Sequence, residues 1–370
     1  MDVKRELGKG EPANKELAAD LASFAVDGGR LIIGVDEANN FALTPTPLPG
    51  LAERIESVAR SRIEEPLVVE FSTIRTDADP NRGYLVVTVP MSPRAPHMVG
   101  NRYWYRGDKT KYPLSDPEVE RLIDLRKRWE PEAEALLDAW IARDPIAAPE
   151  QTNAHLFVVC APVPRVDDAL LPLLQVESWQ AALHELVRRV ERPDKTLSPD
   201  ISQALQHLTR RPNGWGARSR ERPPAEERNL VELEITEDGL LQLMHLGAGA
   251  RLPESGLVVY ESACLAMVHE MVSLATIVGQ EIRFLGNWDI GVAITGLRGS
   301  RSYLRAVKYM GGTVYNEFSY RKVVRATRPE MQTKPAIAVA KLMARFTRAL
   351  GVDGAPEILA LLGQTSDKRP

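Results

Sequence analysis

The sequence predicts an α+β domain over residues 1–130, followed by a second region of mixed α/β character. In the first region, short apolar runs alternate with helical apolar stripes in the order β-α-β-α-β-β-β-α. The chain has 370 residues, more than a single hydrophobic core usually serves. We therefore expect a domain at 1–130, a helix and linker at 131–153, and a second, mixed α/β domain at 154–370.

Apolar spacing and turn residues define the elements of the first region. Leu17, Leu21, Phe24 and Ala25 form one helical stripe, which Asn14 would cap at its start. A pair of glycines, at 28 and 29, would end this helix. The other expected elements are strands at 3–7, 31–35, 67–74, 84–89 and 102–106, and helices at 48–63 and 116–129.

The same signals give the expected elements of the second region. Residues 210–228 carry six arginines around Trp215 and no apolar period, which predicts an exposed loop, with a mobile arm that closes on nucleic acid as the alternative. The expected helices are 131–143, 179–190, 199–209 and 262–278, and the expected strands are 155–163, 230–235, 240–245, 257–259, 282–285 and 292–294.

Composition narrows the class of protein. Hydrophobic residues make up 44% of the chain and charged residues 26%, as in soluble globular proteins. No stretch approaches about 18 uninterrupted apolar residues, and the charged start lacks the apolar core of a secretory signal, so we expect no membrane partner. Cys160 and Cys264 alone predict two buried thiols in a reducing cytoplasm. His269-Glu270 lacks a second histidine at Ser273, so no zinc site is expected.

Several local motifs occur in an order typical of one known family. An acid-x-Lys strand opens the chain at Asp2-Val3-Lys4, and the helix end Ser23-Phe24-Ala25-Val26 leads to Gly28-Gly29. An apolar strand closes in Gly-Val-Asp within Leu31–Glu37, and Tyr103–Asp108 is an aromatic strand followed by Arg, Gly and a polar residue. The N-terminal third thereby resembles the AlbA_2 domain of Schlafen proteins and their bacterial relatives.

The resemblance implies a site for nucleic-acid chemistry. Asp2, Asp36 and Glu37 would hold Mg²⁺ or Mn²⁺, and Lys4 would lie beside the scissile phosphate as the fourth catalytic residue. This requires the opening strand to lie beside the Gly-Val-Asp strand. The alternative is that Asp36 and Glu37 begin a polar turn and Asp2 is a frayed terminus.

The chain departs from the family pattern in three places. Val26 stands where the family usually has Asn, and Glu37 stands where an Asp is common. Ribonuclease-active relatives also carry an acid a few residues before the opening strand, and Met1 stands only one residue before Asp2. The first strand would then be truncated, or the protein would not use this chemistry.

A basic and aromatic window follows at residues 298–328. It holds eight basic residues against one acid, a local charge of +7 in a chain of net charge −3. Cations neutralise phosphates and aromatic rings stack on unpaired bases, so the window predicts nucleic-acid binding. The alternative is a helix and a strand with core aromatics and solvated cations. The expected contact residues are Arg106, Arg301, Arg305, Lys308, Arg321, Lys322 and Arg325.

Together these observations predict a cytoplasmic nucleic-acid-binding protein of Schlafen type, with RNA favoured over duplex DNA. A metal-dependent endoribonuclease acting on structured RNA such as tRNA is one form of this hypothesis. A non-catalytic regulator that binds DNA or RNA is another, and a scaffold in a defence or signalling assembly is a third. A role in phage defence follows from the resemblance alone, and a homo-oligomer stays open.

Overall fold

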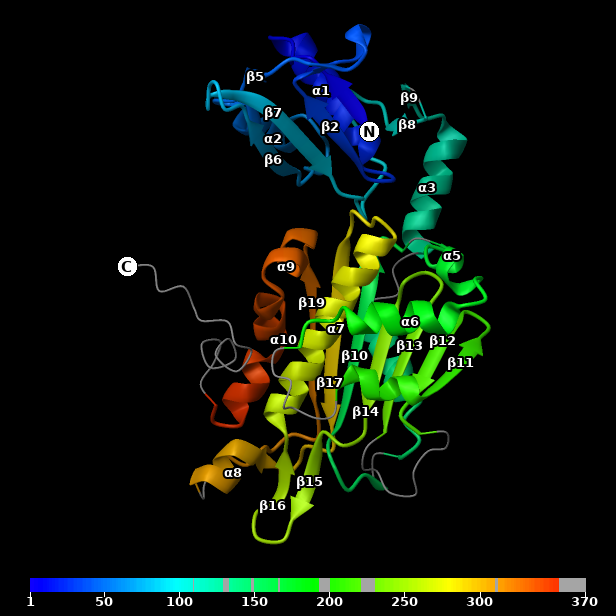
Figure 1. Cartoon of the computed structure of the whole chain (residues 1–370), viewed down its shortest axis with the longest axis vertical. Coiled ribbons are helices and arrows are strands. Elements are labelled where there is room, and N and C mark those ends of the chain that lie inside the picture. Colours follow the sequence, from blue (N-terminus) through cyan, green and yellow to red (C-terminus); the bar gives the residue numbers. More distant parts are fainter. Residues whose placement is uncertain are drawn as a thin grey trace. The chain divides into compact units, whose positions relative to one another are not determined.

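The computed structural model describes residues 1–108, 110–128, 133–147, 150–165, 167–192, 200–220, 230–309 and 312–352. The chain forms two compact units (Figure 1). The first comprises Met1–Glu130 with Phe284–Asn287, and the second comprises Pro131–Arg283 with Trp288–Pro370. Helices and mixed sheets occur together, which confirms the expected α+β class.

The first unit is built on a mixed sheet. β1 (Asp2–Lys4) runs parallel to β2 (Gly29–Ile33), which pairs antiparallel with β7 (Arg82–Val89). β7 in turn pairs antiparallel with β5 (Thr46–Pro47) and β6 (Glu70–Arg75). The other elements are α1 (Glu11–Phe24), β3 (Val35–Asp36), η1 (Glu37–Asn39), β4 (Ala42–Leu43), α2 (Leu51–Ser61), β8 (Trp104–Arg106), β9 (Lys111–Pro113) and α3 (Asp116–Arg128).

Apolar side chains from α1, α2 and the central strands form the core of this unit. Leu21 and Phe24 of α1 belong to the same buried cluster as Ile55 of α2, Leu31 of β2 and Val87 of β7. Burying such side chains is the main favourable term in folding. The stripe predicted from the sequence is therefore the face of α1 that packs into the core.

The start of α1 differs from the expectation. The helix begins at Glu11 rather than after Asn14, and Gly10 precedes it with φ +87°. Pro12 suits the first helical turn because its missing N–H would have no partner there. The Asn14 side chain instead accepts hydrogen bonds from Arg54 Nε (3.1 Å) and Nη2 (2.7 Å), so it links α1 to α2.

The second unit contains a large sheet with the strand order β11-β12-β13-β14-β10-β17-β19 and a smaller one with the order β15-β16-β18. Its helical elements are α4 (Ala133–Ile141), α5 (Leu171–Leu174), α6 (Trp179–Arg188), η3 (Ile201–Gln206), α7 (Glu261–Glu281), α8 (Tyr303–Tyr309), α9 (Arg328–Thr333) and α10 (Pro335–Ala349). Its strands are β10 (His155–Val163), β11 (His207–Arg211), β12 (Gly214–Arg218), β13 (Val231–Thr236), β14 (Leu241–His245), β15 (Gly249–Leu252), β16 (Gly256–Val259), β17 (Asn287–Thr295), β18 (Arg301–Ser302) and β19 (Tyr320–Ala326).

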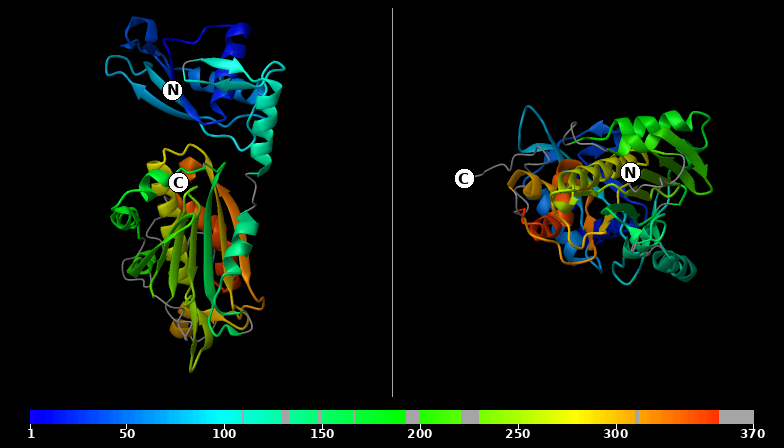
Figure 2. Two further views of the ribbon diagram at one scale, coloured as in Figure 1. Left: turned by 90° about the vertical axis from the view of Figure 1, so that its right-hand side faces the viewer. Right: turned by 90° about the horizontal axis from the view of Figure 1, so that it is seen from below.

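The large sheet is covered on both faces, which explains why β10 reads as a continuous apolar run (Figures 1 and 2). Phe157 and Val159 pack with Trp140 of α4 on one face. Cys160 points to the other face, where its Sγ lies 3.8 Å from the carbonyl oxygen of Met271 in α7. Both cysteines are buried and free, as expected. The helix expected at 131–143 forms as α4, and its Leu137 and Trp140 are part of this core.

α7 is the central helix of the second unit. Among the described residues it is long and apolar enough to span a membrane by length and composition, with a mean hydropathy of 1.5. However, 89% of the most apolar 18-residue stretch of α7 is buried inside the protein, as in the core helix of a folded domain. The helix runs on to Glu281, and β17 starts only at Asn287, so the strand expected at 282–285 does not form.

Two further expectations for the second unit were wrong. The helix expected at 199–209 is the short 3₁₀ helix η3 followed by β11. The expected exposed loop at 210–228 instead begins with the hairpin β11–β12, in which Trp215 is buried and stacks on Trp179 at 6.3 Å between ring centroids. Residues 221–228 of that loop lie outside the described residues.

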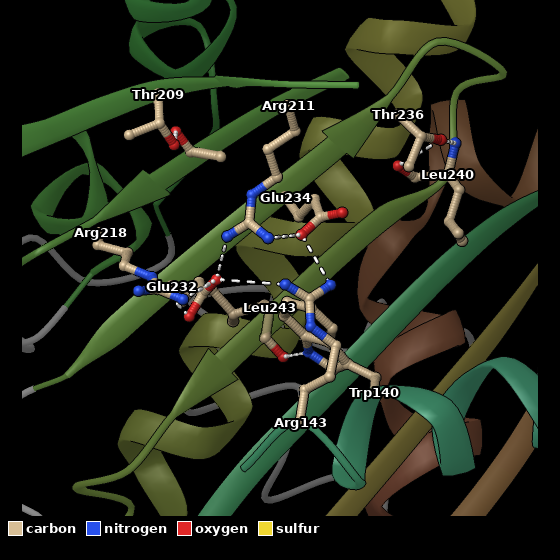
Figure 3. A network of polar contacts seen from close by, with 11 residues as sticks. Trp140, Arg143, Thr209, Arg211, Arg218, Glu232, Glu234, Thr236, Leu240 and Leu243 are labelled. Atoms are coloured by element: carbon tan, nitrogen blue, oxygen red, sulfur yellow. Dashed lines mark hydrogen bonds and ion pairs between the residues drawn. The ribbon is translucent and has the colours of Figure 1, made fainter. Parts of the chain in front are cut away.

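A network of ion pairs holds this hairpin to β13 and to Arg143, which follows α4 (Figure 3). The buried Glu232 of β13 accepts hydrogen bonds from Arg211 Nη2 (2.6 Å) and Arg218 Nη2 (3.0 Å), and Arg143 lies 3.8 Å away. Glu234 pairs with Arg143 at 2.9 Å and with Arg211 at 3.1 Å. Three cations thus share two carboxylates.

Gly216 makes room for this network. A Cβ atom at this position would lie 2.4 Å from Nε of Arg211 and 3.0 Å from the hydroxyl oxygen of Thr209. The guanidinium of Arg211 therefore crosses β12 at the place where the strand has no side chain. The glycines of β12, which suggested a loop in the sequence, are a packing requirement.

A buried histidine lies at the end of β14. His245 is 1% exposed, and its Nδ1 accepts a hydrogen bond from the backbone N–H of Gly247 (3.4 Å). Its Nε2 has no hydrogen-bond partner among the described residues. Burial, with a smaller contribution from the nearby His155, lowers the pKa of His245 from 6.5 to about 4.

Replacing Glu232 by glutamine should lower the free energy of unfolding by about 3 kcal/mol, because it leaves Arg211 and Arg218 partly buried without a full counter-charge. Chemical denaturation followed by circular dichroism measures this change. The exposed pair of Glu185 and Arg188 provides the control, since Glu185→Gln should leave the midpoint almost unchanged. Equal effects of the two substitutions would contradict the assigned role of Glu232.

The second unit should lose stability as the pH falls from 6.5 towards 4, because only unfolded His245 binds a proton readily in this range. The contribution is fully present above the ordinary pKa and declines towards the folded one. The unfolding free energy of the wild type relative to His245→Gln should fall by up to about 1.4 kcal/mol per pH unit. Urea unfolding at several pH values tests this, and a difference that does not depend on pH would contradict it.

Candidate nucleic-acid interface

The two strands that carry the expected acidic residues lie side by side in the first unit. In the parallel pairing of β1 with β2, Asp2 lies opposite Leu31 and Lys4 lies opposite Ile33. The backbone N–H of Gly34 then donates to the carbonyl oxygen of Lys4 (2.8 Å). The predicted adjacency of these strands is therefore confirmed.

The carboxylates themselves do not gather. Gly34, with φ +105°, bends the chain between β2 and β3, so that the single strand expected at 31–35 is interrupted. Asp36 then lies beyond the end of β1, 3.8 Å from Nη1 of Arg5, and the exposed Glu37 begins η1. Asp2, at the start of β1, is at the opposite end of that strand.

Asp2 instead meets a residue expected to contact nucleic acid. Its Oδ1 lies 3.1 Å from Nη2 of Arg106, which β8 supplies from more than one hundred residues further along the chain. The Arg106 guanidinium also lies over the ring of Phe24, 4.7 Å from its centroid. The structure thus brings together two predicted site residues that no local pattern linked.

A third acid at this place was missed from the sequence. Asp20 lies on the buried face of α1, with only 3% of its side chain exposed. Its carboxylate is 2.9 Å from Nζ of Lys4, 2.5 Å from Nζ of Lys111 and 3.9 Å from Nη1 of Arg106. The sequence did hold a sign of this role, since Asp20 follows the apolar Leu17 by three residues and so falls on the core-facing side of the helix. An acid in such a position needs a cation or a hydrogen-bond donor as its partner.

These side chains form one cluster of charges at the first unit, here named the Asp20 cluster. Glu16 joins it, since its carboxylate lies 3.5 Å from Lys4 and 3.9 Å from Lys111. Acids and bases balance in number, so the cations are held by fixed counter-charges. The cluster consists of Asp2, Lys4, Glu16, Asp20, Arg106 and Lys111.

Lys4 is held as a cation by the acids of this cluster. Burial alone would lower its pKa, but the hydrogen bond and the charge of Asp20 outweigh burial and raise the pKa above 10.5. Glu16 and Asp2 add to this effect. Lys4 therefore stays protonated throughout the neutral range, so it can act as a permanent positive charge but not as a base.

The β8–β9 hairpin also carries two aromatic rings. Tyr105 and Tyr112 meet edge to face with their centroids 5.7 Å apart, and Tyr112 is exposed. Tyr112 follows Lys111 directly in β9, so their side chains leave the strand on opposite faces, and Tyr112 packs on Tyr105 rather than on the cations. Its exposed ring is a stacking surface separate from the cluster.

The expected metal ligands do not fit a single ion in this arrangement. Asp2 contacts Arg106 and Asp36 contacts Arg5, and these two carboxylates lie at opposite ends of β1. Across the described residues, no three His, Cys, Asp or Glu side chains are grouped as a metal site. We therefore derive no chemical step through a metal.

In the second unit, two of the expected nucleic-acid contacts are ion-paired. Arg321 donates to Asp138 Oδ1 (2.6 Å) and to the backbone carbonyl of Glu134 (3.0 Å), which connects β19 to α4. Arg325 makes two 2.7 Å hydrogen bonds to its cross-strand neighbour Asp289. These arginines contribute to sheet packing.

The other expected residues of the second unit lie on three elements. Arg301 is in β18, Arg305 and Lys308 are in α8, and Lys322 is in β19. The side chain of Lys308 lies outside the described part of the chain. The expected contacts are therefore distributed over several elements.

The aromatics of the basic window divide in the same way. Tyr315 and Tyr320 are buried and pack against Phe346 of α10, whereas Phe318 is 69% exposed. The alternative of core aromatics therefore holds for Tyr315 and Tyr320 but not for Phe318.

Comparison with known proteins identifies the family of the domain in the first unit. Residues 1–115 match the family model described as Schlafen, AlbA_2. No curated protein matches the chain. The matched residues contain β1, α1, β8 and β9, which together carry the whole Asp20 cluster. The N-terminal third is thus a Schlafen AlbA_2 domain, and this family indicates interaction with nucleic acid.

Proposed function

We propose that the protein binds RNA through the Asp20 cluster of its AlbA_2 domain. The observation that carries the proposal is the convergence of Lys4, Arg106 and Lys111, from separate strands, on one buried carboxylate. Their side chains stay 14–25% exposed, so a phosphate can approach them from solvent. Charge-assisted hydrogen bonds to phosphate are the usual basis of nucleic-acid affinity.

RNA is favoured over duplex DNA for two reasons. The chain carries a net charge of −3, so it lacks the overall positive field that would attract a long duplex. The exposed ring of Tyr112 suits an unpaired base, and unpaired bases occur mainly in RNA loops and ends.

RNA cleavage is a second candidate, supported by the acids and cations at the same place. Asp2 is the carboxylate available to accept the proton of an attacking hydroxyl, and Lys4, Arg106 and Lys111 would offset charge that develops on the phosphate. One Mg²⁺ or Mn²⁺ ion shared by Asp2, Asp36 and Glu37 is not part of this candidate, because Asp2 and Asp36 lie at opposite ends of β1. A regulator would instead bind without turnover, and a scaffold would not retain nucleic acid in a salt-sensitive way.

Lys4→Gln with Lys111→Gln should weaken RNA binding and flatten its salt dependence by about 0.7 for each phosphate that is no longer neutralised. Asp20→Asn should have the opposite effect on affinity, because it releases the cations from their counter-charge. Fluorescence anisotropy with labelled tRNA over a range of salt concentrations measures both changes. Arg60→Gln, on the exposed face of α2, is the matched control and should bind like the wild type.

A purely structural cluster would give a different result, with Asp20→Asn and the lysine variants weakening binding alike through reduced stability. Thermal unfolding of each variant detects that case. If the double lysine variant does not fold, the triple variant that also carries Asp20→Asn removes the carboxylate with its partners and keeps the test. Wild-type protein that retains no RNA at low salt would refute the proposed function.

The second candidate predicts that the full chain cleaves tRNA in the presence of Mg²⁺ or Mn²⁺. Asp2→Asn should reduce the rate by about 100-fold or more while binding persists, because removing a proton acceptor affects the chemical step. Gel analysis of single-turnover reactions measures the rate. Cleavage that survives both Asp2→Asn and the pair Asp36→Asn, Glu37→Gln would assign the activity elsewhere.

A further inference from the structure

The second unit contains a cavity of about 1040 Å³ beside the small sheet β15-β16-β18. Arg251, Arg298 and Arg301 line it, together with apolar and backbone groups from β16 and α8. The acidic residue among its lining is Glu254, so the three guanidinium groups outnumber the acid by two charges. We name it the arginine cavity.

The three arginines of the cavity differ from Arg321 and Arg325 in their surroundings. None of them has a carboxylate within 4.0 Å among the described residues, whereas Arg321 and Arg325 of the same unit both have one. Guanidinium groups near a protein surface usually find an acid or remain in bulk solvent. Three unpaired cations at one cavity therefore leave positive charge available for an external anion.

Ordered backbone places two of these arginines. Arg251 lies on β15 opposite Leu257 of β16, and Arg301 lies on β18 opposite Val258 of the same strand. The buried Glu261, at the start of α7, accepts hydrogen bonds from the Ser302 hydroxyl and from the N–H of Tyr303 (3.0 Å). That carboxylate fixes the junction of β18 and α8, next to Arg301.

A tight turn places the third arginine. Gly299, with φ +85°, follows Arg298, and its N–H donates to the carbonyl oxygen of Tyr315 (2.9 Å). The N–H of Leu297 donates to the carbonyl oxygen of Phe318 (3.1 Å). Arg298 is thereby held between two backbone hydrogen bonds to the segment that contains the exposed phenylalanine.

Arg298 joins this phenylalanine to the cavity. Its guanidinium carbon lies 4.6 Å from the centroid of the Phe318 ring, and 69% of Phe318 is exposed. A planar cation over an aromatic ring is a favourable arrangement. The exposed ring remains available as a stacking surface beside the three guanidinium groups of the cavity.

We propose that the arginine cavity binds a single-stranded segment of nucleic acid, with its phosphates on Arg251, Arg298 and Arg301 and an unpaired base stacked on Phe318. The inference rests on the proposed function for the class of ligand, and it adds a site in the second unit. The cavity is larger than one phosphate needs, and the three cations come from separate segments, which suits successive phosphates of a strand. Stacking on an aromatic ring suits any unpaired base and no base within a duplex.

The test is anisotropy with a labelled 12-nucleotide RNA strand and the full chain. Substituting glutamine at Arg251, Arg298 and Arg301 should reduce affinity about tenfold or more. The slope of log affinity against log salt concentration should become shallower by about 2, because each phosphate contact on a single strand contributes about 0.7. Phe318→Ala should reduce affinity about fivefold or more without changing the slope, because stacking carries no charge. The same strand annealed into a duplex should be insensitive to Phe318→Ala.

The matched control removes three other exposed cations of the second unit, through Arg188→Gln, Lys334→Gln and Lys341→Gln, and should bind like the wild type. An equal reduction of affinity in both triple variants would overturn the cavity proposal in favour of general charge. Retained affinity and slope in the arginine variant would also overturn it. Lys4 and Lys111 lie in the first unit, so their double variant tests the proposed function separately. If that variant alone loses binding, the proposed function stands and the cavity proposal fails.

Discussion

A buried carboxylate must be matched by cations, and this constraint organises both units. In the first, Asp20 lies on the core-facing side of α1 and is held by Lys4 and Lys111 from two strands. In the second, Glu232 is held by Arg211 and Arg218 of the hairpin β11–β12 and approached by Arg143, just after α4. An isolated charge in either position would cost several kcal/mol, so these contacts determine which segments lie together.

The same constraint separates cations that stabilise the fold from cations that remain available. Arg321 and Arg325 were plausible nucleic-acid contacts from charge density alone, but each completes a pair with a neighbouring acid. Arg251, Arg298 and Arg301 have no such acid among the described residues and share one cavity. A count of basic residues cannot make this distinction, because it depends on partners that lie elsewhere in the chain.

Local periodicity was sufficient for elements that bury one clear face. The stripe of α1, the apolar run of β10 and the long helix α7 were all predictable because neighbours along the chain share one environment. The hairpin β11–β12 was not predictable, since arginine and glycine dominate it and the acids that hold it are on β13. For the site, Asp2 and Arg106 were predicted separately and lie in contact, whereas Asp20 was missed and Asp36 lies apart. Long-range ion pairing leaves little trace in short windows of sequence.

Gly216 has a consequence for the order of folding. A strand with glycine at 214 and 216 has weak intrinsic preference for extended structure, so β12 gains little from pairing with β11 alone. The contacts that stabilise β12 come from β13, which follows residues 221–229 in the sequence. They include Glu232, which Arg143, Arg211 and Arg218 all approach. We therefore expect this hairpin to be among the last parts of the large sheet to become protected from hydrogen exchange during refolding, after its neighbour has docked.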